Sequence, residues 1–245
     1  MIKRQNIKSW VIWAISMFLV ISPTVSLGKL AKAELTEELL MIGNLPSGPK
    51  RSSSGRTSGA GSRGSCNIPK TSKLIALIPE DDRAETTISS NPKFFVYIPK
   101  HEVESAEFQI INESGEEVYS IELDISETSG IVKLSLQKSL SLKINQEYTW
   151  RFTMVCDPWD RSGDIFVQGI IKKVEISSEL ENSLKNATPL EEAEIYKKAK
   201  IWNEAIATSA NLRNSNPTKW EELLKSVGLE EIASEPFAPC CLPFK

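Results

Sequence analysis

The fold of this chain is decided by residues 148–171, which read Tyr148-Thr-Trp-Arg-Phe-Thr-Met-Val-Cys156-Asp-Pro-Trp-Asp-Arg-Ser-Gly-Asp-Ile-Phe-Val-Gln-Gly-Ile-Ile171. Apolar and polar residues alternate along both arms, and the alternation stops at Asp157-Pro158 and resumes after Gly163. This pattern is typical of a β-hairpin. Because successive strand side chains point to opposite faces, the apolar residues from Tyr148 to Cys156 share one face. We expect that face to lie in the core.

The residues before this hairpin are also patterned as short strands. Aliphatic or aromatic runs that end in proline lie at 74–79 and 94–99, and alternating runs lie at 106–110, 118–123 and 131–136. Seven or eight short strands with turn residues at this spacing favour an antiparallel arrangement over a parallel sheet. We expect a mainly β fold with an α-helical appendage, in which residues 66–177 form an immunoglobulin-like β-sandwich.

The apolar period becomes helical after a polar break. Thr188-Pro189-Leu190-Glu191 has the form of a capping box with proline at the first helical position. Apolar residues then recur every three or four positions to Ala210, and a second stripe follows Asn216 and ends at Gly228. We expect a short two-helix unit over residues 188–232. One helix pair cannot bury both of its faces, so the unit should pack on the sandwich or on a partner.

The N-terminus has the composition of an export signal. Three positive charges within the first eight residues precede an uncharged run over residues 10–21. That run matches the apolar part of a signal peptide and is short for a membrane span. The small residues Ala31 and Ala33 predict cleavage at the end of a signal peptide over residues 1–33. An uncleaved anchor is the alternative, because the apolar run could extend through Leu27. We expect a periplasmic, secreted or cell-surface protein.

The charge of the mature chain argues against nucleic acid as a partner. The whole chain has a formal net charge of −3, and residues 1–33 carry five positive charges and no acid, so the mature chain has −8. Binding to nucleic acid phosphates requires a basic surface. No other stretch approaches the length of a membrane span, and we therefore expect no integral span after cleavage of the signal.

A Ser/Gly-rich basic linker is predicted over residues 34–65. Residues 43–65 of this segment include almost no residue that could be buried, and they carry four positive charges and no acid: Lys50, Arg51, Arg56 and Arg63. Such a composition is typical of a flexible linker. Contact with an anionic surface and a solvated spacer are both compatible with these charges.

The chain has four cysteines, for which three pairings are possible. Cys66 precedes the first strand and Cys156 ends a late one, so we expect these two to form a disulfide. Closing a loop of about ninety residues would stabilise the domain by several kcal/mol. Cys240 and Cys241 lie in a tail over residues 233–245. A vicinal disulfide, pairing with another chain and the reduced state are all open for them.

No residue pattern indicates a catalytic or metal site, and we expect no enzyme and no cofactor. The one histidine, His101, lies in a polar stretch between two strands, where we expect a solvated loop residue and not a general base. With a single histidine and no closely spaced cysteine pair, a zinc site lacks ligands.

The hairpin turn is the best candidate for a binding surface. It contains three aspartates, a tryptophan and an arginine within eight residues: Asp157, Trp159, Asp160, Arg161 and Asp164. We expect the aspartates to converge near Arg161, where their oxygens could hold Ca²⁺. The alternative is structural, because Asp-Pro starts turns and Arg161 can pair with an aspartate. An exposed Trp159 would mark a contact surface for a glycan or a protein.

Several segments appear in the order of a known family. They include Asn-Pro-Lys-Phe-Phe-Val-Tyr-Ile-Pro99, Tyr-Thr-Trp-Arg-Phe152, Cys-Asp-Pro-Trp-Asp-Arg-Ser162 and Glu-Ile-Tyr-Lys-Lys-Ala-Lys-Ile-Trp-Asn-Glu-Ala205. Together they resemble the cyanobacterial domain-of-unknown-function family 928 over residues 45–232. The resemblance implies an exported envelope or extracellular protein, and it implies no activity.

Three functional hypotheses follow. The favoured one is a non-catalytic interaction module of the cell envelope that binds an envelope or extracellular protein. The second is a carbohydrate-binding or calcium-dependent adhesion module. The third is a hydrolase with an unfamiliar site.

Overall fold

The structure is a computed structural model that describes residues 66, 68–69, 72–80, 84–126, 128–136, 140–239 and 242–243. The predicted signal peptide and linker, and both Cys240 and Cys241, lie outside the described residues. Among the residues described, no helix is long and apolar enough to cross a membrane.

Within the described residues, eight strands precede the helices, in agreement with the sequence pattern. They are β1 (Ile75–Ala76), β2 (Glu85–Thr87), β3 (Lys93–Ile98), β4 (Ser105–Asn112), β5 (Glu117–Asp124), β6 (Gly130–Ser135), β7 (Glu147–Val155) and β8 (Ile165–Lys173). A 3₁₀ turn, η1 (Arg161–Gly163), connects β7 to β8. The helices are α2 (Ser178–Leu184), α3 (Pro189–Lys198), α4 (Trp202–Leu212) and α5 (Pro217–Lys225), followed by η2 (Glu230–Ile232) and β9 (Leu242–Pro243).

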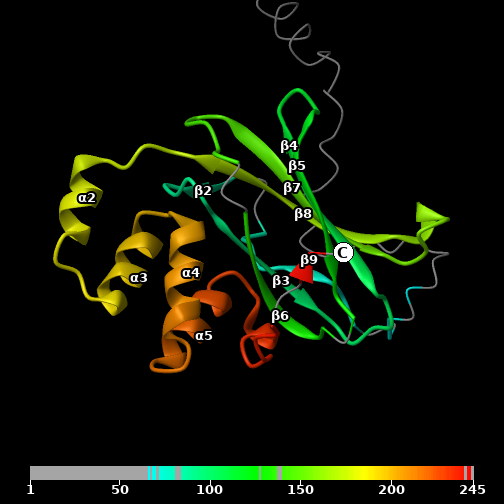
Figure 1. Ribbon diagram of the computed structural model, residues 1–245. Coiled ribbons are helices and arrows are strands. Elements are labelled where there is room, and N and C mark those ends of the chain that lie inside the picture. The colour runs from blue at the N-terminus through cyan, green and yellow to red at the C-terminus, as the bar shows by residue number, and fades with distance from the viewer. Residues whose placement is uncertain are drawn as a thin grey trace, which may run out of the picture. The chain divides into compact units, whose positions relative to one another are not determined.

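The strands form two sheets, which Figure 1 shows beside the helices. One sheet has six strands in the order β2-β8-β7-β4-β5-β9, and the other has three in the order β1-β3-β6. The hairpin of residues 148–171 lies within the larger sheet, where Phe152 is opposite Val167 in an antiparallel register. The prediction of a wholly antiparallel fold is wrong at β2 and β8, which pair in parallel. Because no hairpin joins these two strands, nothing in their connection imposes an antiparallel direction.

The main core lies between the two sheets. The face of β7 that the sequence pattern predicted as buried is indeed inside, with Trp150, Phe152 and Met154 fully buried. Aromatic rings from both sheets meet there: Phe94 of β3 lies 5.0 Å from Phe108 of β4 and 5.3 Å from Trp150 of β7, between ring centroids. Such tilted aromatic pairs add to the free energy of burial.

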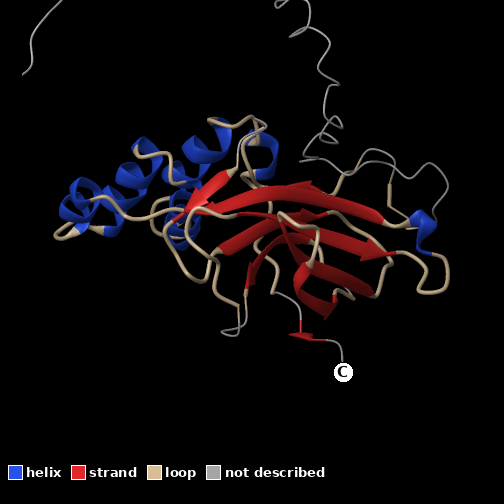
Figure 2. Ribbon diagram, turned by 90° about the horizontal axis from the view of Figure 1, so that it is seen from above, coloured by secondary structure: helices blue, strands red, loops and turns tan. Residues whose placement is uncertain are grey.

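A second core lies between the three-stranded sheet and the helices. Strand β3 has neighbours on both faces, because Phe94 packs in the main core and Phe95 packs against the helices. The helical side of this core includes Ile206 of α4 and Trp220 and Leu224 of α5. Figure 2 shows the helices gathered beside the strands. The order of layers is therefore six-stranded sheet, three-stranded sheet, helices.

The helical region differs from the two-helix prediction. The capping box at Thr188 is present as expected. The helix expected to continue to Ala210 is interrupted at Lys200, whose φ of 59° is incompatible with an α-helix and divides it into α3 and α4. Helix α2 lies in the segment where the sequence pattern indicates a polar break and no helix. Its N-cap Ser177 accepts a hydrogen bond from Leu180 N, and this serine was a usable signal.

The first turn of α4 attaches the helices to the strands through side chains that bind backbone groups. Trp202 donates its indole N–H to the carbonyl of Leu77, at 3.1 Å. The Asn203 amide accepts from the Lys93 N–H at 3.0 Å and donates to the Lys93 carbonyl at 2.8 Å. Glu204 binds the segment that follows β2. We call Trp202, Asn203 and Glu204 the α4 anchor.

The close packing of Trp150 over β8 gives a stability prediction. Trp150 is opposite Gly169 in the strand register, and a Cβ at Gly169 would lie 2.7 Å from Trp150 Nε1 and 2.9 Å from Ile78 Cδ1. We expect Gly169→Ala to lower the free energy of unfolding in urea by about 1–3 kcal/mol. The exposed control Ser120→Ala should stay within about 0.5 kcal/mol of the unsubstituted chain. A Gly169→Ala protein of unchanged stability would contradict this packing.

Candidate functional site

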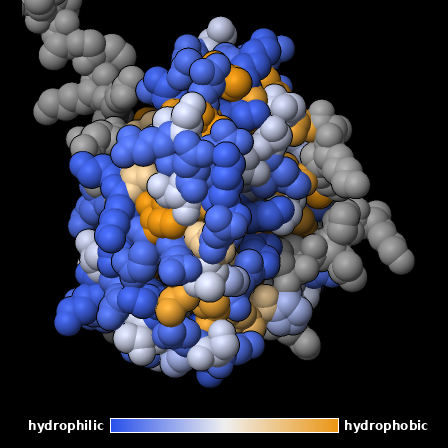
Figure 3. Space-filling model, turned by 90° about the vertical axis from the view of Figure 1, so that its left-hand side faces the viewer, coloured by the Kyte–Doolittle hydropathy of each residue, from blue (hydrophilic) through white to orange (hydrophobic). Residues whose placement is uncertain are grey.

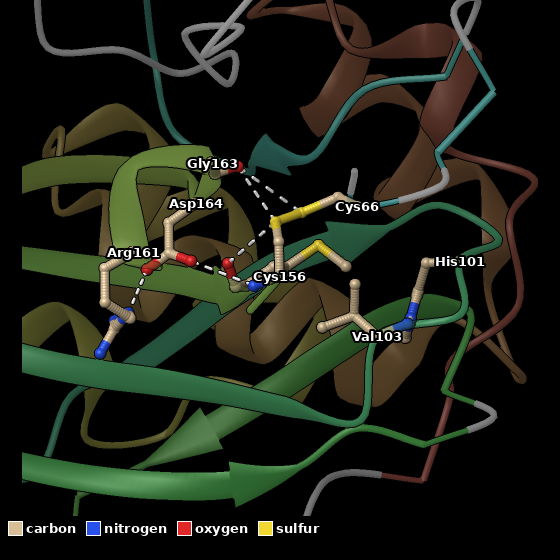
Figure 4. The surroundings of a disulfide bond; sticks show 8 residues. Cys66, His101, Val103, Cys156, Arg161, Gly163 and Asp164 are labelled. Carbon is tan, nitrogen blue, oxygen red and sulfur yellow. Dashed lines mark hydrogen bonds and ion pairs between the residues drawn. A yellow bond between two sulfur atoms is a disulfide. The ribbon is translucent and has the colours of Figure 1, made fainter. Parts of the chain in front are cut away.

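The hairpin turn is fixed at its base by the predicted disulfide. Cys66 and Cys156 are bonded, with a Cα–Cα distance of 4.7 Å and a sequence separation of 90. The Cys156 N–H also donates to Asp164 Oδ1 at 3.0 Å, which ties the end of β7 to the start of β8 (Figure 4). The bond thus joins Cys66, which lies 90 residues earlier in the sequence, to the turn.

The three aspartates of the turn each have a structural partner. Asp157 accepts from the Trp159 N–H at 2.8 Å, and Asp160 accepts from the Ser162 N–H at 3.1 Å as the N-cap of η1. Hydrogen bonds from Ser162 hold the pKa of Asp160 below its ordinary value. Of the three, Asp164 is the one that pairs with Arg161. The turn therefore holds these carboxylates apart, on separate partners.

Arg161 also connects the turn to β4, a strand of the same sheet. Its Nη2 lies 3.1 Å from Glu107 Oε2 on β4. No three His, Cys, Asp or Glu side chains within the described residues are grouped so that they could hold a metal ion.

Trp159 is the most exposed large hydrophobic residue in the described chain, with 96% of its surface accessible. The turn that carries it is held by the disulfide, by the Asp157 and Asp160 hydrogen bonds and by the Arg161 ion pairs. A large aromatic side chain is thus presented to solvent on an ordered backbone, which is how anchor residues of binding surfaces are presented.

The outward face of the six-stranded sheet carries a line of polar side chains beside this turn. The strand registers place Gln168, Arg151, Gln109 and Ser120 next to one another across β8, β7, β4 and β5. We call these four residues the polar row. Arg151 donates to Gln168 Oε1 from Nη2 at 3.1 Å, and its guanidinium lies 4.7 Å from the centre of the Phe166 ring. Gln109 donates to carboxylates on both sides, Glu107 and Glu117.

A separate depression lies between α2 and α3. It has a volume of about 500 Å³. Its lining combines apolar residues with charged residues of both signs, among them Ala187, Leu190, Ile195, Glu194, Lys198 and Lys219. Figure 3 shows the face of the molecule at this end, where hydrophobic side chains lie among hydrophilic ones. We call this depression the α2–α3 groove.

A buried pair of carboxyl groups lies where α4 meets β2, and the sequence reading missed it. Glu85 of β2 is 8% exposed, and its Oε1 accepts from Trp150 Nε1 at 2.6 Å. Burial raises the pKa of Glu85 to about 8, and the nearby charge of Glu204 adds to this. No motif marks such a pair, because it forms between residues more than a hundred positions apart.

Glu204 supplies the other carboxyl group of this pair. Its Oε1 accepts hydrogen bonds from the Thr87 hydroxyl at 2.7 Å and from the N–H groups of Ser89 and Ile88, at 3.0 and 3.2 Å. Burial raises the pKa of Glu204, although these hydrogen bonds act in the opposite direction. Its Oε2 is buried without a hydrogen-bond partner.

His101 is a structural residue in this fold. Its Nδ1 accepts from the Val103 N–H at 3.0 Å, so Nε2 carries the proton and donates to the Thr128 carbonyl at 2.8 Å. Both nitrogens of the ring are therefore engaged, and Figure 4 shows His101 beside Val103.

The acid pair predicts a pH-dependent stability. In the folded chain Glu85 keeps its proton up to about pH 8, against a pKa of 4.5 when it is not perturbed. Folding therefore takes up a proton in that window. The free energy of unfolding should fall as the pH rises from 4.5 to about 8, by up to about 1.4 kcal/mol per pH unit. Glu204 contributes with the same sign, because its pKa is also raised.

Urea unfolding between pH 5 and 8 measures this slope. Glu85→Gln keeps an acceptor for Trp150 but cannot ionise, so its slope should be shallower. The exposed Glu122→Gln on β5 is the matched control and should keep the full slope. Equal slopes for Glu85→Gln and the unsubstituted chain would show that Glu85 is not the titrating group.

The comparison with known proteins gives one match. The family model described as Domain of Unknown Function (DUF928) matches residues 58–237, well over half of the chain. No curated protein matches, and no solved structure matches. As the resemblance of its segments predicted, the chain belongs to the domain-of-unknown-function family 928.

Proposed function

We propose that this chain is an exported, non-catalytic interaction module of the cell envelope that binds a protein partner in the α2–α3 groove. The observation that carries the proposal is the solvent exposure of α2, a helix in which no residue is buried by the described chain. Leu180 and Leu184 are partly accessible, and Leu190 at the start of α3 is 38% exposed. An amphipathic helix normally buries its apolar side chains. A partner would bury these.

The shape and charge of the groove fit an amphipathic helix of the partner. Such helices place apolar residues into a hydrophobic groove at a spacing of three and four. The lining supplies the apolar residues Leu190 and Ile195 and the charged residues Glu194 and Lys219, which pair at 2.8 Å. A rim with both signs of charge suits a peptide with mixed charges better than a polymer of one sign.

Several features support the rest of the proposal. The Cys66–Cys156 disulfide favours an oxidising compartment such as the periplasm or cell surface. The signal peptide over residues 1–33, the envelope location and a cyanobacterial origin belong to the proposal. An interaction module without catalysis agrees with a His101 whose ring nitrogens are both engaged. The immunoglobulin-like topology and the calcium alternative stay predictions.

The groove is tested by reversing its polarity at Leu190. We expect Leu190→Glu to weaken binding of the partner at least about ten-fold, because it places a charge among the apolar residues that line the groove. The protein retained from envelope extracts by the unsubstituted chain would be purified and its dissociation constant measured by calorimetry with each variant.

The matched control is Ile144→Glu, the same change at a residue of similar exposure, 46%, that is not part of the groove. It should leave the affinity unchanged. A partner that binds Leu190→Glu and the unsubstituted chain equally would exclude the groove. Weakening by both variants would show that the effect is not local.

A further inference from the structure

We propose that the outward face of the six-stranded sheet, together with Trp159, is a binding site for an uncharged glycan. The polar row and the hairpin turn carry this inference, and the α2–α3 groove takes no part in it. The helices pack mainly on the three-stranded sheet, and the residues of the polar row are partly or fully exposed.

The polar row has the dimensions of an elongated ligand. Its residues come from four adjacent strands, so it spans three strand spacings of about 4.8 Å, or about 14 Å. Gln168, Arg151 and Gln109 have planar amide or guanidinium groups, and Ser120 ends the row with a hydroxyl. A flat sheet face with donors and acceptors in line is suited to the hydroxyl groups of a sugar chain.

The side chains of the row are already fixed in position. Arg151 is held between Gln168, to which it donates, and the Phe166 ring, over which it lies. Gln109 is held between Glu107 and Glu117, at 3.2 and 2.6 Å. Side chains that are ordered before binding lose less entropy when the ligand arrives, which favours the weak polar contacts that sugars make.

Two exposed aromatic residues lie on the side of the row that faces the turn: Phe166 on β8, two residues from Gln168, and Trp159 in the turn itself. Phe166 is opposite Thr153 in the strand register and is 37% exposed. Trp159 is two residues from Arg161, whose guanidinium reaches Glu107 beside the row. An aromatic face packs against the apolar C–H face of a pyranose ring, and a tryptophan offers the largest such face. The row supplies the polar contacts and Trp159 the stacking contact.

The charges on this face favour an uncharged ligand. Arg161 is paired with Glu107 and Asp164, and the Arg151 guanidinium donates to Gln168 and lies over the Phe166 ring, while exposed carboxylates stand at Asp160 and Glu122. Acidic polysaccharides and anionic lipid headgroups would be repelled by these carboxylates. An uncharged sugar chain meets no such repulsion, and its hydroxyl groups can donate to the same oxygens.

The experiment titrates the full chain with four uncharged hexasaccharides, those of β-1,4-glucose, β-1,4-N-acetylglucosamine, α-1,4-glucose and β-1,4-mannose, followed by calorimetry and by amide NMR shifts. We expect at least one to bind with a dissociation constant below about 1 mM. The shifts should be confined to the polar row and the turn. Trp159→Ala and Arg151→Ala should each weaken this binding about ten-fold or more.

The Leu190→Glu variant is the control and should bind the hexasaccharide normally, because the groove is a separate site. Flat heats and unchanged spectra with all four sugars would overturn the proposal, and so would binding that survives both Trp159→Ala and Arg151→Ala. Binding only to dextran sulfate or to vesicles with phosphatidylglycerol would also overturn it, because the site would then take an anionic polymer or lipid. Each variant is checked for the folded state by circular dichroism.

Discussion

The structure depends on the α4 anchor. Trp202, Asn203 and Glu204 are consecutive in sequence, yet each binds backbone groups of a different strand or of the segment beside it. Backbone groups at strand ends must find partners or water, and buried ones that lack a partner are costly. The anchor supplies partners for three such places at once. The helices therefore complete the hydrogen bonding of the strands as well as covering their apolar surface.

The α4 anchor also has an unfavourable component, because it places the carboxyl group of Glu204 near that of Glu85 where α4 contacts β2. Burial is the main cause of the raised pKa of both carboxyl groups, and the charge of Glu204 adds to the effect on Glu85. The proton held by Glu85, its hydrogen bond to Trp150 and the approach of Trp150 to Gly169 form one connected set of contacts. Packing in the main core and attachment of the helices are thus linked through a single polar network.

The sequence predicted those features that arise from local pattern. The alternation in residues 148–171, the capping box at Thr188 and the β-rich region before the hairpin all depend on neighbouring residues, and the structure has each of them. The Cys66–Cys156 bond could be predicted because four cysteines allow few pairings. Sequence could not predict the parallel pairing of β2 with β8 or the junction of Glu85 with Glu204, because both join residues that are remote in sequence. At the candidate site, sequence identified the exposed Trp159 but not the polar row, which exists only through the strand register.

The central claim is that the α4 anchor makes the sheets and the helices one cooperative body, so that the polar row and the α2–α3 groove are held on a single rigid framework. Native-state hydrogen exchange in increasing urea tests it most directly, because it reports the opening free energy of each amide. The account predicts that amides of α4 and of β3, such as those of Ala205 and Val96, exchange with the same free energy and the same dependence on urea. Helical amides that open at a clearly lower free energy, and with a smaller dependence on urea than the strands, would contradict it.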